Sequence, residues 1–218
     1  MDKARTEKSY KFWDRVSGWS KAESAANSTL VKCLNNKFGI HIMPNDTVLD
    51  FGCGTGTITL RIAQNAKKVY GVDVSGGMLE RAQQNLKNQN IDNTVFIKIT
   101  TLEEMFHDNF FQVITIFNVL QYIENRKELF KQFYKLLRPQ GVLIVAVPCF
   151  GGMNTSSALV VKFLRLVRIM PETYFFNVDK IEKEITDTGF SIIESINLSN
   201  LPEKYIVARK RQEHNVQI

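Results

Sequence analysis

Short apolar runs alternate with amphipathic segments along most of the chain. Runs typical of buried strands lie at residues 47–52, 68–74, 93–99, 110–119 and 141–148. Segments with helical spacing lie between them, at residues 57–66, 76–90 and 125–137. Strands that alternate with helices predict an α/β protein with a parallel sheet and helices on both of its faces.

The C-terminal part breaks this alternation. Residues 190–198 and 204–210 both read as strands, and only the short segment Ser199 to Glu203 separates them. A parallel crossover needs roughly a dozen residues or more, so this pair should form an antiparallel hairpin. Earlier in the chain, Arg138-Pro139-Gln140-Gly141 should form a turn that closes the helix at 125–137.

The most informative motif is the glycine loop VLDFGCGTG, residues 48–56. Its spacing is G-x-G-x-G, whereas the dinucleotide-binding fingerprint is G-x-G-x-x-G/A and would need a small residue at Thr57. Asp50 precedes the first glycine, where it would repel a pyrophosphate but attract a cation. The loop is therefore predicted to pack against a cationic amino-acid group, and a nicotinamide dehydrogenase is disfavoured.

A second acid, Asp73, ends the predicted strand at 68–74. An acid at this place in a nucleotide-binding sheet can accept hydrogen bonds from both hydroxyls of a ribose. A nucleoside that carries a cationic amino acid is S-adenosylmethionine, which is therefore the cofactor that the two motifs predict together.

The segment from Thr47 to Val147 resembles the Rossmann-like (class I) S-adenosylmethionine-dependent methyltransferases, in their small-molecule branch. The resemblance rests on VLDFGCGTG, on GVDVSGGML and on LLRPQGVLIVAVP, which follow one another at the family's spacing. It implies a doubly wound sheet of seven strands whose last strand is antiparallel, in agreement with the hairpin argument.

The resemblance also implies positions for the cofactor-binding residues. Asp50 would lie near the ammonium of the cofactor, Asp73 would bind its ribose, and Asn118 would lie beneath the methionyl group. The methionine end would be lined by the loop residues Gly52, Cys53, Gly54 and Gly56. The adenine would be flanked by Val74, Met78, Thr101 and Leu102. The chain departs from the family at Thr101, where many members have an acid, and at Gln112, where many have aspartate.

The acceptor pocket is less clearly marked. Methyl transfer is an in-line displacement that depends mostly on positioning, so the sequence indicates no catalytic residue. Tyr122 follows the fourth strand at the ligand-binding edge, and Tyr10 and Trp13 lie in an aromatic N-terminal segment. These three side chains either line the acceptor pocket or pack in the core.

One domain is expected, 1–218, with four parts: an N-terminal helical cap at 1–45, a cofactor-binding core at 46–148, a lid or insertion at 149–180, and a C-terminal helix with the hairpin at 181–210. Within the insertion, residues 157–170 are apolar except for three basic residues spaced by three. Such a helix is either core or a lid over a hydrophobic or aromatic acceptor, and its basic side could touch an anionic membrane surface.

Composition narrows the remaining alternatives. The chain has 218 residues, a hydrophobic fraction of 44% and a net charge of +6, which suit one globular domain. Three scattered cysteines, no ligand cluster for a metal and no apolar leader favour a metal-independent cytoplasmic protein. The expected partner is a small-molecule acceptor, and the motifs of nucleic-acid methyltransferases do not fit. An RNA or protein methyltransferase, or a non-catalytic cofactor-binding protein, remains the alternative, and the oligomeric state is open.

Overall fold

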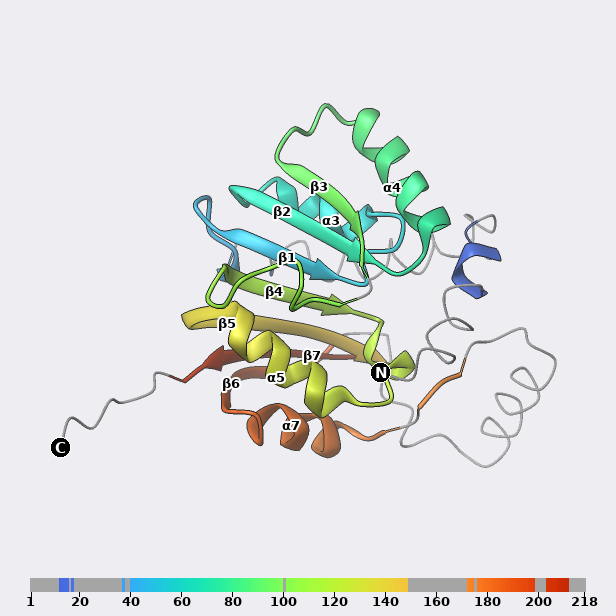
Figure 1. Ribbon diagram of the computed structural model, residues 1–218. Coiled ribbons are helices and arrows are strands. Elements are labelled where there is room, and N and C mark those ends of the chain that lie inside the picture. The colour runs from blue at the N-terminus through green and yellow to red at the C-terminus, as the bar shows by residue number, and fades with distance from the viewer. Residues whose placement is uncertain are drawn as a thin grey trace.

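The computed structural model describes residues 12–15, 17, 37, 40–99, 101–148, 172–174, 176–198 and 203–211. Its helices and strands, shown in Figure 1, are β1 (Thr47–Phe51), α3 (Thr57–Ala63), β2 (Lys68–Asp73), α4 (Gly76–Lys87), β3 (Thr94–Lys98), β4 (Phe111–Phe117), the 3-10 helix η1 (Leu120–Tyr122), α5 (Arg126–Leu136), β5 (Leu137–Pro148), α7 (Val178–Thr186), β6 (Phe190–Asn197) and β7 (Glu203–Lys210).

The strands form one seven-stranded sheet in the order β3-β2-β1-β4-β5-β7-β6. Strands β1 to β5 pair in parallel, whereas β7 runs antiparallel to both of its neighbours, β5 and β6. The predicted Rossmann-like sheet with an antiparallel last strand is therefore confirmed. In this arrangement the carboxyl ends of β1, β2 and β4 and the start of β7 lie along the same edge.

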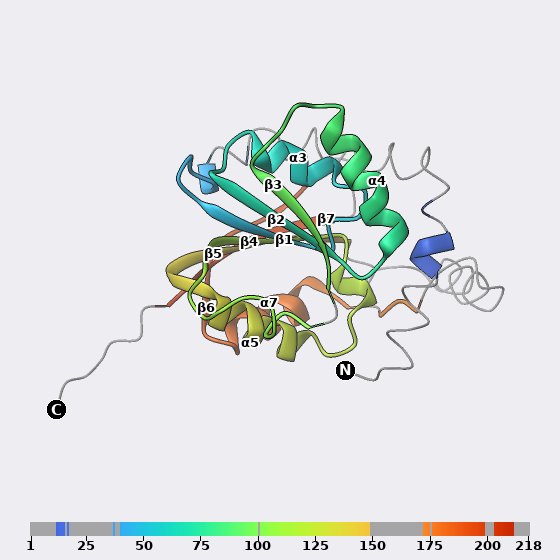
Figure 2. The same ribbon diagram turned by 45° about the horizontal axis from the view of Figure 1, so that its top comes forward.

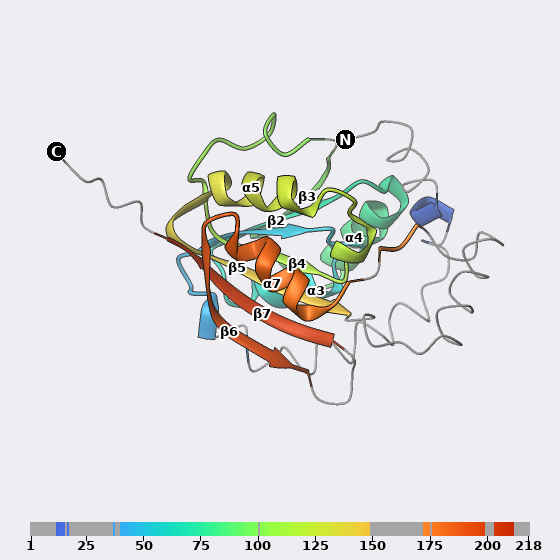
Figure 3. The same cartoon turned by 90° about the horizontal axis from the view of Figure 1, so that it is seen from below.

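Helices cover both faces of the sheet. Figures 2 and 3 show α5 and α7 on one face and α3 and α4 on the other. The central strands are buried on both sides, which explains why β4 reads as a nearly continuous apolar run. Phe130 and Phe133 of α5 pack with Ile181 of α7 in the larger core cluster, and Ile58 of α3 packs in the second.

The fold departs from the sequence expectation where α5 meets β5. The helix ends at Leu136 and β5 begins directly at Leu137, so no separate turn divides them. The predicted turn is instead an irregularity inside β5, because Phe111 pairs with Leu137 while Val113 pairs with Val142. Gln140, within it, has a φ of 64°. A local reading of the sequence finds this turn but cannot see that the residues before it already pair with β4.

Arg126 and Gln112 make contacts that connect elements of the fold. Arg126 is buried and binds both carboxylate oxygens of Glu184 at 2.7 and 2.9 Å, which joins α5 to α7. Its guanidinium also lies 4.8 Å from the ring centre of Phe176. Where β1 and β4 begin, Gln112 Oε1 accepts a hydrogen bond from the Thr47 N–H at 2.7 Å, so Gln112 links these two strands.

Candidate functional site

The glycine loop joins β1 to α3 at the carboxyl edge of the sheet. Gly52, Gly54 and Gly56 have φ values of 74°, 53° and 76°, all in the left-handed region that favours glycine. A Cβ on Gly52 would come within 2.3 Å of a methyl carbon of Val119, so the loop also packs tightly against the segment after β4. The three glycines are therefore needed for the backbone path of the loop.

Asp73, at the end of β2, holds this loop in place. Its two carboxylate oxygens accept hydrogen bonds from the N–H groups of Gly54, at 3.0 Å, and Ser75, at 2.9 Å. Burial raises the pKa of Asp73, and these backbone N–H groups act in the opposite direction. Each carboxylate oxygen has a second lone pair, so the group can also accept from the hydroxyls of a ribose.

Asp50 lies beneath the loop and is only 3% exposed. Its carboxylate accepts hydrogen bonds from the hydroxyls of Thr59, at 2.6 Å, and Thr115, at 2.8 Å. Burial nevertheless raises the pKa of Asp50 from 3.8 to about 6. The sequence did not indicate the two threonines, which come from α3 and β4. The contact between Asp50 and the cofactor ammonium stays a prediction.

Cys53 lies in the same loop and is partly buried. Burial, followed by the charges of Asp73 and Asp50, raises the pKa of Cys53 well above its ordinary value. The side chain therefore stays a neutral thiol near pH 7 and is unsuited to act as a nucleophile.

The residues predicted to flank the adenine follow β2 and β3. Val74 is half-buried directly after β2, and Met78 is buried in the first turn of α4. Thr101 is exposed, and Leu102 is buried within the larger core cluster. Their contacts with a cofactor stay predictions.

Asn118 follows β4 in a left-handed conformation, with a φ of 57°. Its N–H donates to the Ala146 carbonyl at 2.8 Å, and its own carbonyl accepts from Nε2 of Gln121 at 2.7 Å. Gln121 is 4% exposed and was not singled out from the sequence. The only signal in the sequence that could have identified Gln121 as a site residue is its position in the first turn after β4.

The N-terminal segment and η1 meet through their aromatic side chains. The Trp13 ring lies 5.1 Å from the Tyr122 ring in an edge-to-face arrangement, so two of the three predicted acceptor residues are brought together. Tyr10 lies outside the described residues, as does the predicted lid at residues 157–170.

Asp14, beside Trp13, was missed by sequence reasoning. Its Oδ1 accepts hydrogen bonds from the Ser75 hydroxyl at 2.5 Å and from the Gly77 N–H at 3.1 Å. Ser75 is the N-cap of α4, so this carboxylate sits at the positive end of the helix dipole. The contact attaches the N-terminal segment to the region that holds Asp73.

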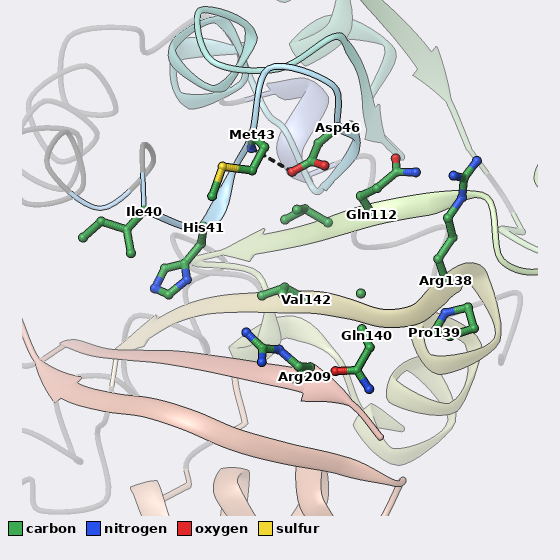
Figure 4. A pocket seen from close by; sticks show the side chains of 12 residues that line it. Ile40, His41, Met43, Asp46, Gln112, Arg138, Pro139, Gln140, Val142 and Arg209 are labelled. Carbon is green, nitrogen blue, oxygen red and sulfur yellow. Dashed lines mark hydrogen bonds between the residues drawn. The ribbon is translucent and has the colours of Figure 1, made fainter. Parts of the chain in front are cut away.

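A pocket of about 330 Å³ lies at the opposite edge of the sheet, where β4 and β5 begin (Figure 4). Arg138 and Arg209 line it, and Figure 4 shows their guanidinium groups pointing to different ends of it. His41, also in its wall, has its Nε2 atom 3.0 Å from Oε2 of Glu194, which is hydrogen-bond distance. The pocket shares no residue with the glycine-loop site.

Two properties of the described residues bear on ligands and surroundings. They contain no group of 3 or more histidine, cysteine, aspartate or glutamate side chains that could hold a metal ion. None of their helices is both long and apolar enough to span a bilayer.

Comparison with known proteins identifies the family. Residues 42–185 match the family described as Methyltransferase domain, and the chain belongs to it. The predicted class, a Rossmann-like methyltransferase with S-adenosylmethionine as its cofactor, is thereby confirmed.

Individual relatives share shorter stretches. The chain is 31% identical over 109 residues to a demethylmenaquinone methyltransferase of Lactiplantibacillus plantarum, which covers 48% of this chain and 46% of that protein. It is 48% identical over 60 residues to an uncharacterized RNA methyltransferase of Clostridium acetobutylicum, covering 28% of this chain and 13% of that protein. The chain thus spans less than half the length of these two relatives.

Among solved structures, the fold is similar to phosphoethanolamine N-methyltransferase 2 of Haemonchus contortus, solved with S-adenosyl-L-methionine. The TM-score is 0.69 at 20% identity, with 85% of this chain and 53% of that chain covered. At this identity the similarity establishes the fold alone.

Proposed function

We propose that the chain transfers a methyl group from S-adenosylmethionine to a small-molecule acceptor with hydrophobic or aromatic character. The observation that carries the proposal is the Asp73 carboxylate, which binds the glycine loop and still has lone pairs for a ribose. The contact of Gly52 with Val119 places the segment after β4 directly beside this loop. The residues present therefore fit the cofactor.

The chain's own residues would mostly position the reactants. The cofactor supplies a methyl group activated by the adjoining sulfonium. The glycine loop and Asp73 would hold the nucleoside and amino-acid parts, while Asn118 at the end of β4 would lie beside the reacting centre. The Trp13–Tyr122 pair would form an apolar wall that keeps water from the acceptor.

The similarity to a quinone-directed methyltransferase supports a hydrophobic acceptor. Similarity to an RNA methyltransferase extends over 60 residues only, and it covers 13% of that protein. It therefore gives no support for an RNA-binding surface on this chain. Membrane-surface contact by the predicted lid and a cytoplasmic location also remain proposals.

The test combines binding with turnover. Calorimetry should show binding of S-adenosylmethionine and S-adenosylhomocysteine, with NAD as the control that does not bind. Mass spectrometry of reactions with a metabolite library should then show S-adenosylhomocysteine release that depends on an acceptor. Binding without turnover would favour a non-catalytic cofactor-binding protein, and turnover on RNA that falls steeply with salt would favour an RNA methyltransferase.

A further inference from the structure

Three buried oxygen atoms at the carboxyl edge of the sheet have no hydrogen-bond partner among the described residues. They are Oδ1 of Asn118, Oε1 of Gln121 and Oε2 of Glu203. Buried polar atoms in folded proteins are nearly always paired, so three such atoms in one region require an explanation. A fourth, the hydroxyl of Tyr205, lies further along β7.

The three residues come from neighbouring parts of the sheet. Asn118 directly follows β4, and Gln121 belongs to η1 after it. Glu203 begins β7 and pairs with Pro148 at the end of β5. Because β4, β5 and β7 are consecutive strands of the sheet, these side chains share one stretch of its edge.

The hydrogen bonds that these residues do make determine which atoms are left over. Nε2 of Gln121 donates to the Asn118 carbonyl, which can only accept, so Oε1 must be the atom that points away. Burial raises the pKa of Glu203, and a side-chain hydrogen bond with Asn118 opposes this rise; a carboxylate can only accept, so the Asn118 amide N–H is the donor and Oδ1 is its free atom. The Gln121 carbonyl accepts from the Tyr174 N–H at 2.7 Å, which fixes the residue further.

Among the described residues, no cation compensates the charge of the group. Glu203 forms no ion pair with any of the described lysine, arginine or histidine side chains. Burial raises the pKa of Glu203, which is the effect expected of a carboxylate without a cation beside it. The three oxygens together offer three acceptors and one negative charge. A primary ammonium offers three donors and one positive charge, whereas a hydroxyl offers a single donor and no charge.

We propose that Asn118, Gln121 and Glu203 form a subsite that binds an ammonium group of the methyl acceptor, with Glu203 as the residue that determines specificity for amines. The inference rests on the proposed function and names the polar part of its acceptor.

The position of Glu203 separates this subsite from the cofactor. Strand β7 lies three places from β1 in the sheet, and strands are about 4.8 Å apart, which puts Glu203 roughly 14 Å across the edge from the glycine loop. Asn118, which directly follows β4, the strand next to β1, lies between the two. The subsite therefore extends from the reacting centre away from the nucleoside.

The experiment uses tyramine and tyrosol, which share a phenol ring and differ in carrying an ammonium or a hydroxyl. Calorimetry on the full chain saturated with S-adenosylhomocysteine should show tyramine binding at least tenfold more tightly than tyrosol. Ethanolamine against ethylene glycol repeats the comparison without the ring. Glu203→Gln should weaken amine binding at least tenfold and leave the alcohols within twofold. Glu203→Asp, which keeps the charge, should retain part of the preference.

The matched control is Glu128→Gln on the exposed side of α5, which should leave the affinities for the amines and for the alcohols unchanged. Equal binding of both members of each pair by the wild type, absence of binding by every amine, or an unchanged preference in Glu203→Gln would overturn the inference. Weaker S-adenosylhomocysteine binding in a folded Glu203→Gln would also overturn it, because the oxygens would then serve the cofactor. By contrast, a wild-type protein that binds no S-adenosylhomocysteine would contradict the proposed function itself.

Discussion

Asp50 and Asp73 lie close to the same loop but in different environments. Asp73 accepts hydrogen bonds from backbone N–H groups at the loop surface, while Asp50 is enclosed beneath the loop between two threonine hydroxyls. The sequence motif treats both as ligand-binding acids. The structure shows Asp73 bonded to the loop backbone and Asp50 bonded to side chains of α3 and β4, while the contacts of both acids with the cofactor stay predictions.

Asp73→Asn should weaken binding of S-adenosylhomocysteine about tenfold to hundredfold. The change removes the charge and one acceptor, and hydrogen bonds to charged groups contribute about 1.5–3 kcal/mol. Calorimetry measures the affinity, and thermal unfolding confirms that the variant is folded. Asp92→Asn, at an exposed aspartate, serves as the control. Unchanged affinity in Asp73→Asn would contradict the assigned role.

Asp50→Asn tests the cost of the buried charge. Because the pKa of Asp50 rises from 3.8 unfolded to about 6 folded, its contribution to stability is complete below pH 3.8 and is lost as pH rises through 6. Relative to wild type, the variant should therefore gain on the order of 3 kcal/mol in unfolding free energy between pH 3.5 and pH 8. Urea unfolding of both proteins at several pH values measures this difference.

Asp187→Asn is the control of opposite sign. Hydrogen bonds from Lys127 and Lys183 lower the pKa of Asp187, so its contribution is present above its unfolded pKa and lost as pH falls. The Asp187 variant should lose stability near neutral pH relative to acid, whereas the Asp50 variant gains it. Parallel pH profiles for the two variants would show that the Asp50 effect is not specific to burial.

At the scale of elements, the alternation of apolar and amphipathic runs located every strand of the sheet because buried strands and amphipathic helices differ in period. It could not find the bulge in β5, the threonines around Asp50 or the Asp14 contact with α4. Each of these features depends on contacts between residues far apart in the sequence, and a local sequence pattern does not indicate which distant side chains will be in contact. The residues that we predict to bind the cofactor could be located because the glycines of the loop follow a fixed local spacing.

Asp14→Ala should loosen the attachment of the N-terminal segment to α4. A carboxylate at a helix N-terminus contributes on the order of 0.3–1 kcal/mol, and salt screens the effect. Urea unfolding at low and high salt should show a loss of this size that shrinks as salt rises. Arg15→Ala, at the neighbouring exposed residue, should not reproduce it. A salt-independent loss would point to packing instead of the helix dipole.

For the whole molecule, the described residues offer no metal-binding group, and turnover should not depend on a metal. Dialysis against EDTA should leave the rate of S-adenosylhomocysteine release unchanged once an acceptor has been found. Restoring lost activity with magnesium or zinc would show that residues outside the described ranges supply ligands.

The ion pair between Arg126 and Glu184 has a consequence for how such a chain can change over generations. Strand β5 pairs with β7, and Phe176 lies against the guanidinium of Arg126, which in turn binds Glu184. The end of β5 and the segment at Phe176 are therefore both held by contacts within the fold. Substitutions at Arg126 or Glu184 would have to preserve this pairing, because removing one partner leaves the other charge buried without compensation.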